Sequence, residues 1–186
     1  MKNANRKFTD TDVRVNCRLS YANLFTPRSV NGSEPRYSCT LLVDKGDPVA
    51  MKLVRDAEDA AKKQFKEKFG DYKGKLKSVV YDGDEDFPDD ENCEGKLVIR
   101  TSSKKQPGIK VLDSGMLVDA LDEDEVYSGC FAAVEVNFYP YNQQSGKGVS
   151  AGLNNVLKLE DGTRLGGGGR SADAAFEDLT DRKSVV

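Results

Sequence analysis

The sequence predicts a mainly β protein: an antiparallel barrel with one inserted amphipathic helix and a flexible C-terminal tail. Several stretches of the 186 residues alternate apolar and polar side chains, as half-buried strands do, whereas one stretch has the period of a helix. Strand and helix patterns do not alternate along the chain, so a parallel sheet is not indicated. Four glycines at residues 166–169 introduce an acidic end, which we expect to be a flexible tail.

The first two strands are predicted on either side of a turn-rich segment. In residues 13–21 every second residue is apolar, Tyr21 included, and Arg14 and Arg18 fall on the opposite face. Residues 27–35 contain two prolines and an Asn-Gly pair, which are typical of turns. Alternation then resumes in residues 37–43, which we expect to form the second strand.

The helix is predicted to begin at Asp47-Pro48, an N-cap residue followed by proline at the first helical position. Apolar residues recur at helical spacing over residues 53–69. Gly70 stands where a C-terminal cap glycine belongs. We therefore expect one amphipathic helix of about twenty residues after the second strand.

The remaining strands follow the helix. Residues 97–101 alternate, and residues 109–112 form a short apolar run. The longest alternating stretch, residues 127–141, leads through a turn at residues 145–148 to a last strand at residues 149–159. A closed five-stranded barrel of the OB type fits these elements best.

The chain is thus expected to have three parts. Residues 1–10 form a flexible N-terminus, residues 11–165 form the barrel domain, and residues 166–186 form a flexible Gly-rich and acidic tail. The glycines at 166–169 are followed by no Lys-Ser or Lys-Thr pair, so they indicate a linker and not a phosphate-binding loop.

Composition excludes several classes of protein. The chain has no histidine, so catalysis by a Ser/His/Asp or Cys/His arrangement and zinc sites with histidine ligands are excluded. The four cysteines contain no Cys-x-x-Cys pair, and we interpret them as reduced core residues of a cytosolic protein. No export signal and no membrane span are expected, because no apolar stretch is long enough. No metal or other cofactor is predicted.

Charge is unevenly distributed around a net value of −3. Three stretches, residues 82–94, 119–125 and 171–186, together hold 17 of the 31 acids and 2 of the 28 bases. The rest of the chain therefore holds 14 acids and 26 bases, a balance that permits a basic face.

Aromatic residues interleaved with bases are the main candidates for a binding site. Aromatic rings stack on the bases of single-stranded nucleic acid, and Lys or Arg neutralises its phosphates. The alternative is that tyrosines at strand ends only close the barrel, with their hydroxyls in water. The candidates for stacking are Tyr21, Phe25, Tyr139 and Tyr141, and those for the backbone are Arg18, Arg28, Arg36, Lys104, Lys105 and Lys147.

The acidic stretch at residues 82–94 suggests three alternatives. Its acids begin with the spacing of a calcium loop, but Cys93 stands where a bidentate Glu is needed, so an EF-hand is not supported. Asp89 with Glu94 and Lys96 resembles the acidic and lysine elements of magnesium-dependent nucleases. The third alternative is a solvated or turn-stabilising loop, which we favour over a nuclease.

Several separated motifs together resemble a family of bacteriophage single-stranded-DNA-binding proteins. They occur in order over about residues 11–169, and the ordered set is more specific than any one of them. The motifs are Ser20-Tyr21-Ala22-Asn23-Leu24-Phe25 with Pro27, Asp82-Gly83-Asp84 with Pro88-Asp89-Asp90, residues 103–108, Tyr127-Ser128-Gly129-Cys130, Asn137-Phe138-Tyr139, Gly146-Lys147-Gly148 and Gly152-Leu153-Asn154-Asn155.

The resemblance implies an OB-fold, binding to single-stranded DNA during phage replication, recombination or repair, and no catalysis. It also implies a place in the cytoplasm of the infected bacterial host. Members of this wider group often end in an acidic tail that contacts phage or host replication proteins and competes with DNA. Here the tail carries four acids but ends Arg182-Lys183-Ser184-Val185-Val186, without a terminal aromatic residue. A homo-oligomer is compatible with the sequence.

Overall fold

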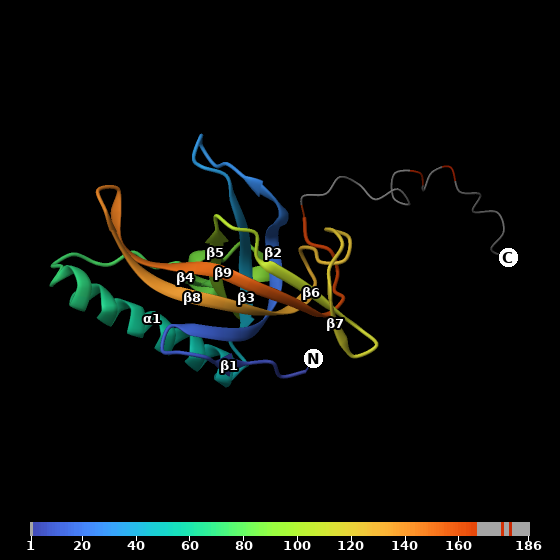
Figure 1. Ribbon diagram of the computed structural model, residues 1–186, viewed down its shortest axis with the longest axis horizontal. Helices are drawn as coiled ribbons and strands as arrows, with labels where there is room; N and C mark the ends of the chain where they lie inside the picture. Colours follow the sequence, from blue (N-terminus) through green and yellow to red (C-terminus); the bar gives the residue numbers. More distant parts are fainter. Residues whose placement is uncertain (1, 167–175, 177–178, 180–186) are drawn as a thin grey trace.

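The structure is a computed structural model that describes residues 2–166, 176 and 179 (Figure 1). Strands dominate it, and one long helix lies along one side. In chain order the elements are β1 (Arg6–Lys7), β2 (Asp12–Arg28), β3 (Arg36–Asp44), α1 (Pro48–Phe69), β4 (Val80–Asp82), α2 (Gly83–Asp86), the 3-10 helix η1 (Glu91–Cys93), β5 (Lys96–Ser103), β6 (Gly108–Asp113), β7 (Met116–Asp119), β8 (Phe131–Gln143) and β9 (Gly146–Glu160).

Five strands form a closed barrel in the order β5–β3–β2–β8–β9. Neighbouring strands in this order pair antiparallel. The barrel closes where β5 and β9 run parallel, with Ser102 opposite Gly152. This confirms the predicted OB-type barrel, whose strands are those expected from alternation.

Four shorter strands extend the barrel at its edges. β1 pairs with β2, β4 pairs with β5, and the β6–β7 hairpin continues the sheet from β9. The sequence analysis missed β1, β4 and β7, which have two, three and four residues. Alternation cannot identify strands this short, since a period of two needs several residues to become visible.

The core lies inside the barrel and follows the alternation of the strands. On β8 the predicted inner residues Ala132, Val134, Val136 and Phe138 are all buried. The four cysteines are also buried and free, as expected for reduced core residues. Burial raises the pKa of the Cys39 thiol to about 12, so this side chain behaves as an apolar group.

Helix α1 begins and ends where the sequence predicts. The Asp47 side chain accepts a hydrogen bond from the backbone N–H of Ala50, and Pro48 occupies the first turn. Gly70, with φ 82°, donates its N–H to the carbonyl of Lys66 and ends the helix. The buried face of α1 packs into the barrel core through Val54, with Ala50, Ala57 and Ala61.

Residues 2–10, predicted to form a flexible N-terminus, contact the barrel and α1 in the structure. β1 pairs with β2, and Asn16 on β2 accepts from Ala4 N–H and donates to the carbonyl of Lys2. Asn5 also donates to Asp47, the N-cap residue of α1. The hydrogen bonds to Asn16 and Asp47 span 12 to 42 residues along the chain, so local composition does not reveal them.

The predicted tail lies almost entirely outside the described residues. Its attachment is described: the N–H of Leu165 donates to the carbonyl of Ser128, and its side chain packs beside Leu42, Cys93 and Val98. In the described part of the chain, no helix combines the length and apolar character needed to cross a bilayer.

Candidate nucleic-acid interface

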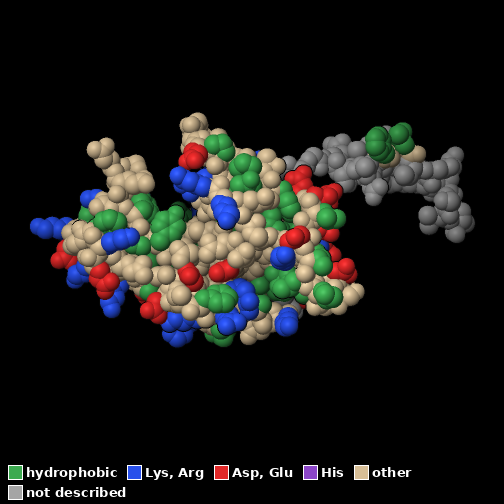
Figure 2. Space-filling view, viewed as in Figure 1, with side chains coloured by type: hydrophobic (Ala, Val, Ile, Leu, Met, Phe, Trp, Pro, Cys, Tyr) green, Lys and Arg blue, Asp and Glu red, His purple; other side chains and the backbone are tan. Residues whose placement is uncertain are grey.

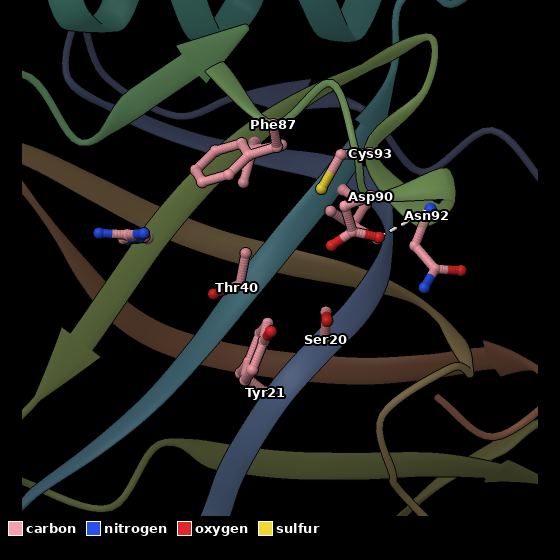
Figure 3. Close-up of a pocket in the computed structure, with 10 residues that line it drawn as sticks. Ser20, Tyr21, Thr40, Phe87, Asp90, Asn92 and Cys93 are labelled. Atoms are coloured by element: carbon pink, nitrogen blue, oxygen red, sulfur yellow. Dashed lines mark hydrogen bonds between the residues drawn. The ribbon is translucent and has the colours of Figure 1, made fainter. Parts of the chain in front are cut away.

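A hollow of about 310 Å³ lies on the outer side of β2, β3 and β5. Tyr21 and Phe87 lie on opposite sides of Thr40, and Asp90 and Asn92 lie at one end (Figure 3). We call this surface the hollowed face: the outward side chains of β2, β3 and β5 together with the loop of residues 82–94. It offers rings, amides and a carboxylate around a space open to solvent.

Tyr21 reaches the hollow because β2 is irregular at this point. The register between β2 and β3 shifts between Ser20 and Asn23. Tyr21 has φ 46°, a left-handed conformation that is uncommon for a residue with a side chain. Simple alternation placed Tyr21 on the buried face of its strand, which is wrong, because the irregularity turns it outward and leaves 74% of it exposed.

Arg100 on β5 lines the hollow, and sequence reasoning did not select it. Its guanidinium carbon is 4.9 Å from the ring centroid of Tyr81 and 5.7 Å from that of Phe87. The two rings meet edge to face at 5.7 Å. Arg100 forms no ion pair with any described residue, so its charge is available to a ligand. The sequence did contain a signal for Arg100, because the alternation in residues 97–101 assigns its side chain to the outer side of the strand.

The acidic loop is folded into a wall of the hollow. Lys45 at the end of β3 donates to Asp82 at 2.6 Å and to Asp84 at 2.7 Å. The Lys45 ammonium lowers the pKa of both carboxyls, and main-chain N–H donors lower them further. A Cβ on Gly83 would lie 2.0 Å from the carbonyl oxygen of Cys93, so this position admits only glycine. The loop is thus turn-stabilised, and its fold brings Phe87 to the hollow.

The nuclease alternative receives no support from this loop. Within residues 2–166, no three His, Cys, Asp or Glu side chains are grouped to hold a metal ion. Asp90 accepts from the N–H of Asn92, and Asp84 accepts from the N–H of Gly95. These carboxylates stabilise turns.

Two predicted tyrosines on β8 continue the rings of the hollowed face. Tyr139 is 37% exposed, and its ring lies against Gly152 of β9, where the barrel closes. The pKa of Tyr141 is raised, first by burial and then by the nearby hydroxyls of Tyr81 and Tyr139. Tyr139 and Tyr141 stand two residues apart on β8 and therefore share its outer face.

Four predicted basic residues gather where the β2–β3 and β5–β6 loops meet. Arg28 lies opposite Arg36 in the register of the hairpin, and Arg36 approaches the Ser102 hydroxyl at 3.5 Å. Lys104 forms an exposed ion pair with Glu34 at 3.2 Å, while Lys105 is exposed without an ion pair to a described residue. The cluster borders one end of the hollowed face.

Three other candidates are differently placed. Arg18 donates to the carbonyls of Gly129 and Thr163 at 3.0 and 2.8 Å, so its donors serve the fold. Phe25 is half-buried and packs against the barrel core, which leaves little of its ring for stacking. Lys147 lies on the β8–β9 hairpin, where its ammonium is 4.8 Å from the ring centroid of Tyr72.

Comparison with known proteins identifies the family. The family model described as the single-stranded-DNA-binding protein of Enterobacter phage Enc34 matches residues 11–186. The chain belongs to this Enc34 single-stranded-DNA-binding protein family. A curated relative of the chain, a protein designated p50 from Acyrthosiphon pisum secondary endosymbiont phage 1, is 29% identical over 174 residues, which are 89% of this chain and 91% of that protein.

Solved structures agree with the assignment to the Enc34 family. The Enc34 protein in complex with single-stranded DNA matches with a TM-score of 0.74 and 28% identity, covering 89% of this chain and 99% of that one. Another structure of the Enc34 protein gives a TM-score of 0.70 over 95% of this chain and 99% of that one, also at 28% identity. The bacteriophage T7 protein gp2.5, at 15% identity, covers 98% of this chain and 99% of its own with a TM-score of 0.53, which indicates a shared fold.

Proposed function

We propose that this protein binds single-stranded DNA on the hollowed face and coats it without catalysing a reaction. One base enters the hollow between Tyr21 and Phe87, and the strand continues over Tyr139 and Tyr141. Membership of the Enc34 family supports the choice of ligand, because the solved Enc34 protein holds single-stranded DNA.

The single observation that carries the proposal is the position of Arg100 over two rings beside an open hollow. Stacking on a ring binds a base whatever its identity, and a nearby guanidinium attracts the phosphate that links it to the next base. A site built on this chemistry tolerates many sequences. The basic cluster of Arg28, Arg36, Lys104 and Lys105 then receives phosphates at one end of the face.

Membership of the family supports a proposal for the biological setting. The protein is proposed to act in the cytoplasm of the infected bacterial host, where it protects single strands during replication, recombination or repair of the phage genome. Its tail is proposed to contact phage or host replication proteins. The tail begins beside the hollowed face, because Leu165 packs against Leu42 and Val98.

The test is a fluorescence titration with labelled single- and double-stranded oligonucleotides across a salt series. We expect affinity for oligo-dT to fall steeply with salt, with a slope of about −0.7 in log K per phosphate contacted. An affinity that is equal for both oligonucleotides, or that does not change with salt, would contradict the proposal.

The stacking component is tested by changing Tyr139 and Tyr141 together to Ala. Each ring should contribute about 1 to 3 kcal/mol if a base stacks on it, so loss of both rings should lower affinity roughly 30-fold or more. The control is a separate variant, Tyr72→Ala, which removes an exposed ring outside the hollowed face. Both variants are titrated with a short oligonucleotide. Affinity of the double variant within twofold of wild type would eliminate stacking on β8.

A further inference from the structure

Lysines accumulate where α1 ends. Residues 62–77 contain seven lysines and two acids. Figure 2 shows Lys and Arg side chains gathered at this end of the molecule, and acidic ones at the opposite end. We call this surface the lysine end; its exposed members are Lys63, Lys66, Lys68, Lys73, Lys75 and Lys77.

Helix stabilisation accounts for only part of this charge. Lys66 and Lys68 lie in the last turn of α1, where cations favour the helix dipole. Lys73 and Lys75, however, lie beyond the helix. Lys66 pairs with Asp71 at 3.4 Å, but Lys68, Lys73 and Lys75 form no ion pair with a described residue. Three uncompensated positive charges are therefore presented to solvent within eight residues.

Two exposed rings lie among these lysines. Phe69 and Tyr72 are 42% and 44% exposed, and both pack against the buried ring of Phe65, at 5.1 and 6.3 Å between centroids. Their positions are therefore fixed by the helix. Rings and cations held side by side are the combination that grips a single strand without reading its sequence.

The β8–β9 hairpin lies between the lysine end and the tyrosines of β8. Lys147, on the hairpin between β8 and β9, lies over the ring of Tyr72. Lys77 donates its N–H to the carbonyl of Lys147 and its ammonium to the carbonyl of Ser145. In the β8–β9 register, Tyr141 stands opposite Gly148, the residue after Lys147. Tyr141 and Lys147 therefore project from opposite faces of this hairpin, and a strand that leaves Tyr141 would reach Lys147 and Tyr72 by passing around the hairpin edge.

We propose that the lysine end is a second phosphate-binding surface, which receives the single-stranded DNA that leaves the hollowed face over the β8–β9 hairpin. The inference rests on the proposed function and extends it. A short oligonucleotide fills the hollowed face alone, whereas a longer one also occupies the lysine end. The site size of the protein is thus larger than that of its barrel face.

The test compares two triple variants with the same change in net charge. The test variant is Lys68→Gln, Lys73→Gln and Lys75→Gln, and the control is Lys7→Gln, Lys52→Gln and Lys110→Gln. The control lysines are already paired with Asp10, Asp56 and Asp119. Both variants and the wild type are titrated with oligo-dT of about 8 and about 25 nucleotides, within and beyond the span of a typical OB-fold site.

For the longer oligonucleotide we expect the test variant to bind roughly ten-fold more weakly than the control, with its salt slope smaller by about 2, or about 0.7 for each lost phosphate contact. For the shorter one the two variants should agree within twofold. Equal binding of the longer oligonucleotide by both variants would overturn this inference alone. A wild-type chain that binds neither oligonucleotide would overturn the proposed function.

Discussion

The hollowed face and the β6–β7 hairpin both expose apolar side chains and both border an acidic segment, but they differ in the kind of apolar side chain and in whether their cation is paired. On the hollowed face the exposed groups are rings, and Arg100 lies over two of them. On the hairpin they are aliphatic, with Met116 69% and Leu117 62% exposed. The hairpin and the segment after it are acidic, and Lys110 on β6 is held by Asp119 at 2.5 Å.

The difference shows that exposed apolar surface alone does not identify a nucleic-acid interface. A phosphate backbone is repelled by the carboxylates of residues 119–125. Aliphatic side chains also lack the flat face on which a base stacks. Substitutions on the hairpin therefore serve as controls for substitutions on the hollowed face.

Between these two surfaces, the largest effect is expected from changing Tyr21 and Arg100 together to Ala. Loss of one stacking ring and one free cation should weaken binding to oligo-dT by about 10- to 100-fold, that is about 1.4 to 2.8 kcal/mol. Both side chains are exposed, so the thermal midpoint should change little. Unchanged affinity in a fluorescence titration would show that the DNA does not bind at the hollow.

Gly83→Ala should displace the wall of the hollow. The new methyl group would collide with the carbonyl of Cys93, and overpacking of this kind destabilises proteins by about 1 to 3 kcal/mol. We expect a lower urea midpoint together with weaker binding of oligo-dT. Gly32→Ala is the control, because a Cβ there meets no atom within 4 Å, although its φ of 74° adds some local strain. If Gly83→Ala kept wild-type stability and affinity, the loop would not shape the site.

Lys45→Met should have a smaller effect that depends on pH. Lys45 lowers the pKa of Asp82 and Asp84 in the folded protein. Their contribution to stability is therefore present above about pH 4, the ordinary pKa of Asp, and is lost as the pH falls through the lower folded values. The variant should be less stable than wild type at pH 7, and the difference should shrink near pH 2.

Urea unfolding at the two pH values measures this difference. Lys52→Met is the matched control, since it removes an exposed pair with Asp56 from the surface of α1. A difference that stayed constant between pH 7 and pH 2 would show that Lys45 contributes by packing and not by charge.

The smallest effect is expected on the hairpin. Met116→Ser with Leu117→Ser removes exposed apolar surface without changing charge, so affinity for oligo-dT should stay within twofold of wild type. The same titration checks this. A loss as large as that expected for Tyr21 and Arg100 would abolish the distinction between the two surfaces.

Much of the fold was predictable because its signals are local. Asp47-Pro48 and Gly70 mark the ends of α1, and their capping bonds span only three or four residues. Alternation located the five barrel strands, because successive side chains of a strand point to opposite faces and only one face of each strand packs into the core. The acidic loop could be recognised as a feature, but its wall-forming role could not, because Lys45 lies 37 residues from Asp82.

The candidate site was less predictable, as Arg18 and Arg100 illustrate. Both were assigned by alternation to the outer side of a strand, but the donors of Arg18 are used by backbone carbonyls, whereas Arg100 lies over two rings. Arg18 is engaged by a carbonyl 145 residues further along the chain. Tyr21 shows the converse, since alternation places it inside and an irregularity in β2 exposes it.

The amino-acid pattern alone was sufficient for the barrel, for its single helix and for a supply of rings and cations on the outside. Only the folded chain decided which of those side chains remain available to a ligand. The physical reason is that burial periodicity is set by neighbours in sequence, whereas the freedom of a charge or a ring depends on partners that folding brings from far away.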